Sequence, residues 1–186
     1  MKKNLLNNLL LTALLSAGMA SADTPVVPAS PDADLASKVT HEIRMYPRYT
    51  IWDNINFRVQ SGNVDLTGEV SQPYKKSEIG RIVAGIPGVK TVTNDLEVLP
   101  LSRMDDQLRV QVARAIFHDS VLSRYAMQPV PPIHIIVDNG HVTLEGVVST
   151  EMEKEIAGIR ASGAGLSFGQ VVNNLRVENP SKTKHS

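Results

Sequence analysis

The sequence predicts an α+β protein of two tandem α-β-β-α-β units, each a two-layer sandwich in which a three-stranded sheet packs on two helices. The first observation is a repeat, since NVDLTGEVS at 63–71 recurs as HVTLEGVVS at 141–149. The second is the order of hydrophobic periods, which switches between helical and strand spacing in the same way in both copies. A unit of this size, about 70 residues, can bury a core of its own.

The segment 1–22 has the layout of a cleavable secretory signal peptide. Lys2 and Lys3 precede a short apolar run, and Ala20-Ser21-Ala22 is a small-residue cleavage site, so we expect cleavage after Ala22. A buried N-terminal helix is the alternative interpretation; the run is too short to remain as a bilayer anchor. The chain is therefore expected to be periplasmic, with a flexible linker rich in Pro, Ala and Ser at 23–33.

Composition argues against several functional classes. The chain has no cysteine, so it has neither disulfides nor a lipid-attachment site, and export without disulfides is typical of a bacterial periplasm. Without Lys2 and Lys3, 17 basic residues face 19 acidic ones, a net charge near −2, and no stretch holds five like charges. We therefore expect no nucleic-acid partner and no polybasic membrane anchor.

The first unit, residues 34–100, begins with a helix and continues with two strands. An apolar stripe predicts a helix over about 34–46, which Pro47 ends; the stripe is Leu35, Val39 and Ile43. Two alternating segments then predict strands joined by a turn at Ser61-Gly62. Their inward-facing residues are Ile55, Phe57 and Val59, followed by Val64, Leu66, Gly68 and Val70.

A second helix and a third strand complete the first unit. Ser71 as the N-cap and Pro73 in the first turn predict the start of the helix, and Pro87-Gly88 its end. Its apolar stripe is Ile79, Ile82, Val83 and Ile86. The strand over 92–98 has one polar exception on its apolar face, Asn94. Because each strand has one polar side, the helices must cover the apolar face and leave the other face open.

The second unit, residues 101–178, repeats this order after a hinge at 99–105. Asp138-Asn139-Gly140-His141 is a strong hairpin signal, because Asn-Gly accepts the positive φ angles of a type I′ turn. A Gly-rich segment at 163–170 has no counterpart in the first unit, and 179–186 is expected to be a disordered tail. The predicted core residues are Leu108, Val112, Ile116, Ile133, Ile135, Val137, Val142, Leu144, Val148, Met152, Ile156, Ile159, Val171, Leu175 and Val177.

Together these motifs resemble the BON domain family. The family pattern runs G-x-V-x-L-x-G-x-V, then a helix, then G-V-x-x-V-x-N-x-L-x-V. The first unit follows it at 62–70 and 88–98, and the second at 140–148 and 171–177. The second unit departs from the pattern at 163–170, where GAGLSFGQ replaces the tight Gly-Val turn.

The resemblance implies a non-enzymatic module of the cell envelope that needs no cofactor. It further implies binding to anionic phospholipid or membrane surfaces and a role in osmotic or envelope stress, here in a soluble form because no anchoring cysteine is present. The alternative that we retain is a protein–protein interaction or scaffold module with an envelope protein as its partner.

The segments between the first helix and the first strand of each unit are the candidate contact surface. Three of the four tyrosines and the only tryptophan lie there. These side chains suit a boundary that is apolar on one side and wet on the other, and neighbouring arginines can meet phosphate. The alternative is that the aromatics close the ends of two small cores. The candidates are Tyr46, Arg48, Tyr49, Trp52, Leu122, Arg124, Tyr125 and Met127.

Motifs for catalysis and metal binding fail on physical grounds. Gly165-Leu-Ser167-Phe-Gly169 matches G-x-S-x-G, but a helix precedes it and a strand follows, the reverse of a nucleophile elbow. The histidines are expected to be scattered on the surface, and the hairpin register places His134 opposite Glu145, well separated from His141. No catalytic residue and no metal ligand is therefore predicted.

Five glycines are predicted to be structural. Gly68 and Gly146 fall on the apolar face of the second strands, where a missing side chain lets a helix approach or marks a bulge. A ligand approaching the bare backbone is the alternative. The full set is Gly62, Gly68, Gly88, Gly140 and Gly146.

Overall fold

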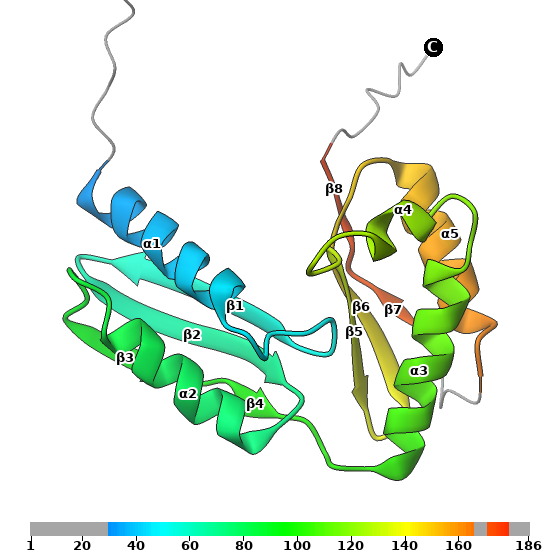
Figure 1. Ribbon diagram of the computed structural model, residues 1–186, viewed down its shortest axis with the longest axis horizontal. Helices are drawn as coiled ribbons and strands as arrows, with labels where there is room; N and C mark the ends of the chain where they lie inside the picture. Colours follow the sequence, from blue (N-terminus) through cyan, green and yellow to red (C-terminus); the bar gives the residue numbers. More distant parts are fainter. Residues whose placement is uncertain (1–29, 166–170, 179–186) are drawn as a thin grey trace, which may run out of the picture.

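The structure, a computed structural model, describes residues 30–165 and 171–178. The predicted signal peptide, most of the predicted linker, the Ser167 motif and the tail lie outside this part. Two α+β domains follow one another, each with helices against one face of a sheet (Figure 1), which confirms the predicted fold class. The longest helices in the described ranges have 15 residues, and none is long and apolar enough to cross a bilayer.

Each domain has the predicted order of elements, with additions. Domain 1 comprises α1 (Pro31–Met45), β1 (Asn54–Gln60), β2 (Asn63–Val70), α2 (Pro73–Ala84), β3 (Thr91–Asn94) and β4 (Glu97–Val98). Domain 2 comprises α3 (Arg103–Phe117), α4 (Ser123–Ala126), β5 (Ile133–Asp138), β6 (His141–Val148), α5 (Glu151–Ser162), β7 (Val172–Asn173) and β8 (Arg176–Val177). The short helix α4 was not predicted.

The two sheets share one topology and one register. In domain 1, β2 is central: β1 pairs with it antiparallel on one side, and β3 and β4 pair with it in parallel on the other. In domain 2, β6 has the same neighbours, β5 on one side and β7 and β8 on the other. The predicted hairpin is confirmed, since Asp138 pairs with His141 and Asn139 and Gly140 have φ angles of 48° and 80°.

The third strand of each sheet is interrupted at an asparagine, so the prediction of one continuous strand over 92–98 is wrong. The side chain of Asn94 donates from Nδ2 to the carbonyl of Lys76 in α2 (2.8 Å) and accepts from the N–H of Leu96. Asn173 makes the equivalent bonds to Lys154 and Leu175. The polar exception thus ties the sheet to the second helix.

The N-terminus of α1 lies three residues before the predicted one, so 31–33 belong to the fold and not to the linker. The Ser30 hydroxyl accepts from the N–H of Ala33 as an N-cap. The carboxylate of Asp32 then accepts from the backbone N–H groups of Ser61 and Gly62 in the β1–β2 turn. This bond clamps the helix start to the hairpin, and Asp105 at the start of α3 does the same for the β5–β6 turn.

Two further predictions about side chains are wrong. Gln72, not Ser71, occupies the N-cap position of α2, and Ser71 is buried instead. On α5 the predicted stripe is wrong at Met152 and Ile159, which are 62% and 68% exposed, whereas Ile156 is half-buried and packs against the core as predicted. The core-facing residues are Glu153, Ala157 and Ala161, because small alanines let α5 pack closely.

The five structural glycines all have positive φ. At Gly68 (φ 107°) an added Cβ would overlap the carbonyl oxygen of Asn54, and at Gly146 (φ 116°) that of Pro132. The close approach is therefore made by the start of the neighbouring strand, and the interpretation that a helix approaches there is wrong.

Gly68→Ala and Gly146→Ala are each expected to lower the free energy of unfolding by about 2 kcal/mol or more, because left-handed strain and the overlap add. The control is Gly85→Ala, where φ is −81° and the nearest atom lies 3.4 Å from the added Cβ. It should change stability by less than about 1 kcal/mol. Urea denaturation followed by circular dichroism measures all three, and equal effects would contradict this account.

Candidate functional site

The structure buries most of the aromatic candidate residues. Tyr46 is 6% exposed in the core of domain 1, and Leu122 and Tyr125 are 0% and 5% exposed in the core of domain 2. Their positions favour the alternative in which these side chains close the ends of the cores. The exposed candidates are Arg48, Arg124 and Met127.

Both exposed arginines have acidic partners. Arg48 bonds to both carboxylate oxygens of Glu78 from α2, at 2.7 and 2.8 Å, and lies over the ring of Tyr74. The hydroxyl of Tyr46 also donates to Glu78, and burial together with this bond raises the pKa of Tyr46 to about 12. Arg124 pairs with Glu153 at the start of α5. Their charges are therefore largely compensated.

Residues 49–53, the docking segment, join the two domains. The carbonyl of Ile51 accepts a hydrogen bond of 2.7 Å from the N–H of Ile135 in β5, the edge strand of domain 2. Ile51 and Trp52 pack against the core of domain 2, and the segment between α1 and β1 reaches β5 in Figure 1. Two of the candidate residues are therefore half-buried between the domains. Trp52 packs against the core of domain 2, and Tyr49 belongs to the same segment.

The sequence predicts that the sheet face opposite the helices is open and polar. In domain 2 this prediction is wrong in part. Ile136, which points to that face, is only 5% exposed. His134 on the same side is half-buried with its ring 5.5 Å from that of Tyr49, so it is not a scattered surface histidine. Its Nδ1 is buried and has no hydrogen-bond partner in the described ranges. Burial lowers the pKa of His134. The nearby backbone of Asp53 and Thr50 and the carboxylates of Asp53 and Glu145 raise this pKa, but their effect is smaller than that of burial.

Because folding lowers the His134 pKa below its ordinary 6.5, stability should be lost as pH falls through 6.5 towards the folded-state value. Thermal unfolding followed by fluorescence of Trp52, the only tryptophan, measures this loss. His134→Gln should remove this part of the pH dependence, whereas His41→Gln, on the exposed side of α1, should keep it. An unchanged pH profile in His134→Gln would count against the assignment.

A buried polar cluster holds the docking segment in shape. Asp53 is fully buried and accepts from the N–H and hydroxyl of Ser71 (both 2.8 Å), and Lys75 donates to it at 2.6 Å. Lys75 also donates to Ser71 and Thr50, at 2.9 and 3.3 Å. Lys75 thus has three acceptors for its three N–H donors, and the carboxylate, the hydroxyl and the amine form a closed set of buried hydrogen bonds. The cluster is structural.

Domain 2 buries the opposite charge at the equivalent position. Glu153 occupies the place in the repeat that Lys75 has in domain 1, and it is 3% exposed. It accepts from the hydroxyl of Tyr125 and from the N–H groups of Ser149 and Thr150, and it completes a capping box with Thr150. Tyr125 therefore serves this cluster, and each copy satisfies its own buried charge locally.

Lys75→Met is expected to destabilise the protein by about 3–5 kcal/mol, because it leaves Asp53 buried without its counter-ion. The matched control is Lys38→Met, which removes an exposed pair with Asp34 on α1. It should cost less than about 1 kcal/mol. Urea midpoints measure both changes, and similar midpoints would contradict the role given to the cluster.

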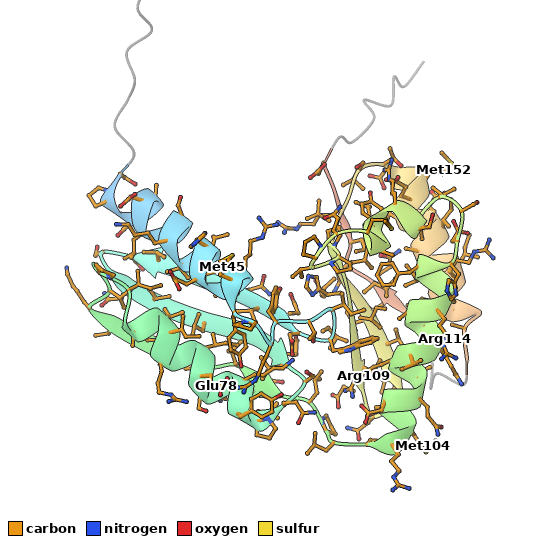
Figure 2. The ribbon with its side chains drawn as sticks, viewed as in Figure 1. Met45, Glu78, Met104, Arg109, Arg114 and Met152 are labelled. Atoms are coloured by element: carbon orange, nitrogen blue, oxygen red, sulfur yellow. The ribbon has the colours of Figure 1, made fainter. Side chains whose placement is uncertain are left out.

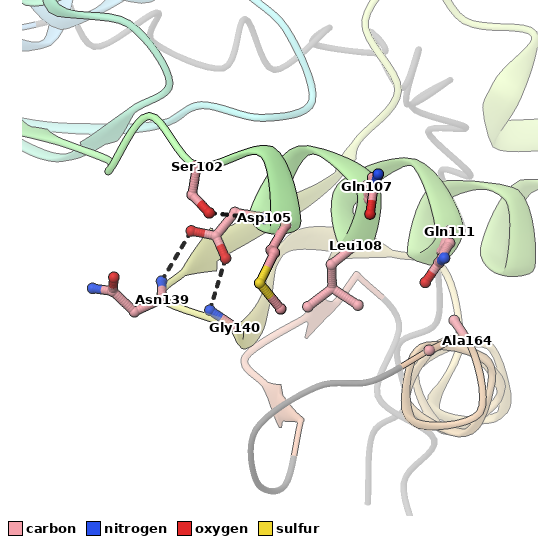
Figure 3. A pocket seen from close by; sticks show the side chains of 10 residues that line it. Ser102, Asp105, Gln107, Leu108, Gln111, Asn139, Gly140 and Ala164 are labelled. Atoms are coloured by element: carbon pink, nitrogen blue, oxygen red, sulfur yellow. Dashed lines mark hydrogen bonds between the residues drawn. The ribbon is translucent and has the colours of Figure 1, made fainter.

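The cavity beside the start of α3 offers no reactive group. It has a volume of 560 Å³ and lies between α3, the β5–β6 turn and Ala164-Gly165. Its carboxylate, Asp105, already accepts from the N–H groups of Asn139 and Gly140, at 3.1 and 2.8 Å (Figure 3). In the described ranges no group of three metal-ligating side chains is found either.

A positively charged groove lies between α3 and α5 on the outer side of domain 2. It has a volume of 660 Å³, and the residues that line it include Arg114, His118, Asp119, Ile159 and Arg160. Arg160 pairs with Asp119 at 2.7 Å, whereas Arg114 forms no ion pair with the described residues. Figure 2 shows Arg114 on the side of α3 away from domain 1. Sequence reasoning missed this groove because it placed Ile159 in the core.

The equivalent groove of domain 1 differs in charge. It lies between α1 and α2, has a volume of 430 Å³, and is lined by Lys38, Glu42 and Arg81, among others. Domain 1 has His41 at the position of Arg114, and the charges of Lys38 and Arg81 are balanced there by Glu42 and by Asp34, the partner of Lys38. The groove of domain 2 is therefore the more cationic of the two.

The model of the BON domain matches residues 31–100 and 105–179. The chain belongs to the BON domain family. It is a tandem BON-domain protein, as the repeated motifs predict, and the two matches coincide with the two domains of the structure. BON domains are non-catalytic modules.

Solved structures add only a weak likeness. Two structures of CdsD, a structural protein of the type III secretion system of Chlamydia trachomatis, are 17% and 18% identical to the chain, each with a TM-score of 0.31. The matches cover 78% of this chain and 65% and 61% of those chains, so it spans less than two thirds of their length. Such a likeness carries no argument about function. No curated protein matches the chain.

Proposed function

We propose that the chain is a non-enzymatic, exported tandem-BON protein of the bacterial envelope that binds anionic phospholipid surfaces during osmotic or envelope stress. The groove between α3 and α5 is the observation that carries the proposal, because it combines Arg114, which forms no ion pair with the described residues, with the exposed Ile159. The signal-peptide pattern and the absence of cysteine support export to the periplasm.

The groove has the chemistry that a lipid surface requires. The Arg114 guanidinium, which has no acidic partner in the described ranges, can bind a pair of phosphate oxygens. Ile159, 68% exposed, can enter the apolar boundary below the headgroups. Because the mature chain is near −2 overall, attraction must come from this local patch and not from net charge. Binding is therefore expected to weaken as salt is raised.

Arg114→Glu is expected to lower affinity for vesicles of phosphatidylglycerol in phosphatidylcholine by about tenfold or more, since each charge near an anionic surface contributes about 1 kcal/mol. The matched control is Arg81→Glu, which reverses a charge in the equivalent groove of domain 1 and should change affinity much less. Vesicle co-sedimentation at low salt measures both.

An equal loss of vesicle affinity in the two variants would contradict the assignment of the groove as the binding site. A lack of vesicle binding by the unaltered mature chain would contradict the lipid proposal itself. A pull-down of an envelope protein that survives detergent would then favour the interaction-module alternative.

A further inference from the structure

The two edge strands, β1 and β5, are covered to different extents although they are equivalent in the repeat. Phe57 pairs with Leu66 as Ile135 pairs with Leu144, so the register is the same. The inward-facing residues of β5 are 0% exposed, whereas their counterparts in β1 are only half-buried. The pairs are Ile133 and Ile55, Ile135 and Phe57, and Val137 and Val59. Domain 1 thus presents an apolar edge that lacks a cover in the part of the chain that the structure describes.

The cover in domain 2 is the docking segment. Ile51 accepts a hydrogen bond from the outward N–H of Ile135, and Ile51 and Trp52 pack against the core behind it. Since Phe57 has the place of Ile135 in the register, its N–H also points outward from the sheet. In the described ranges β1 pairs with β2 alone, so this edge is open.

The chain carries a second docking segment, at 127–131, which has the place in the second repeat that 49–53 has in the first. In it Pro129 corresponds to Ile51 and Val130 to Trp52. A proline keeps the carbonyl, which is all that the contact takes from Ile51 by hydrogen bonding. Residues 126–129 are all exposed, and Met127 is 86% exposed, the largest value among the large apolar side chains of the described ranges.

We propose that residues 127–131 of one copy dock on the β1 edge of a second copy, with the carbonyl of Pro129 accepting from the N–H of Phe57. This contact between two copies would have the same form as the contact between Ile51 and β5 within one chain. A cleft of 340 Å³ borders Asn54 to Phe57 on one side and Val130 to Pro132 on the other, so the edge is accessible. Because segment and edge border one cleft, two copies can exchange segments reciprocally, which favours a closed pair over a filament.

Single-cysteine variants test this contact directly, because the chain has no cysteine of its own. Gln128→Cys and Asn56→Cys, both at exposed positions, are made in separate copies of the full mature chain and mixed under oxidising conditions without lipid. The mixed disulfide is expected to form about tenfold faster than with Gln107→Cys, an exposed glutamine on α3, in place of Gln128→Cys. Equal rates would overturn the proposal.

Sedimentation velocity of the same chain, also without lipid, should show a mass that rises from one copy to two with concentration. Met127→Asp should abolish this rise and leave the thermal midpoint unchanged, because the Met127 side chain is exposed and an aspartate there disturbs no core. A monomer at every concentration would overturn the proposal whether or not the chain binds vesicles, so the test is independent of the lipid proposal.

Discussion

The contact of the docking segment with β5 joins the two domains of this protein. It begins with a buried ion pair, because Asp53 is held by Lys75 and Ser71 and in turn bonds the backbone and hydroxyl of Thr50. The docking segment then directs Ile51 and Trp52 towards domain 2. The carbonyl of Ile51 accepts from the N–H of Ile135 in β5, and both side chains pack against the core of domain 2. The ion pair therefore supports the segment that covers the edge of β5, whereas in the described ranges the equivalent edge of β1 is open.

Duplication has preserved the framework and changed what lies around it. Both copies keep the carboxylate clamp on the hairpin, the asparagine that ties sheet to helix, and the glycine of the central strand that faces the start of the neighbouring strand. They differ in the sign of the buried charge, Lys75 against Glu153, and beside the groove between the helices, where His41 is the counterpart of Arg114. A binding function that belongs to only one of the two domains is therefore expected at the residues in which they differ.

The two proposals use separate surfaces and can hold together. The lipid proposal places the membrane against the helices α3 and α5, whereas self-association uses the cleft beside β1. A pair of copies would present two cationic grooves to a membrane, and two weak contacts that act together bind far more tightly than one. Burial of Tyr46 and Tyr125 moves the expected contact from the aromatic loops to the helices.

The sequence by itself determined the elements whose side chains repeat with a local period. Leu35, Val39 and Ile43 define α1, and Asn139-Gly140 defines the hairpin, because helical spacing and turn chemistry act over a few residues. It could not orient α5, since Ala157 and Ile159 both suit a helix and only packing decides which one faces the core. Nor could it show the domain contact, because the Ile51–Ile135 hydrogen bond joins backbone atoms that every residue except proline possesses. Only the tertiary structure brings that carbonyl to that edge.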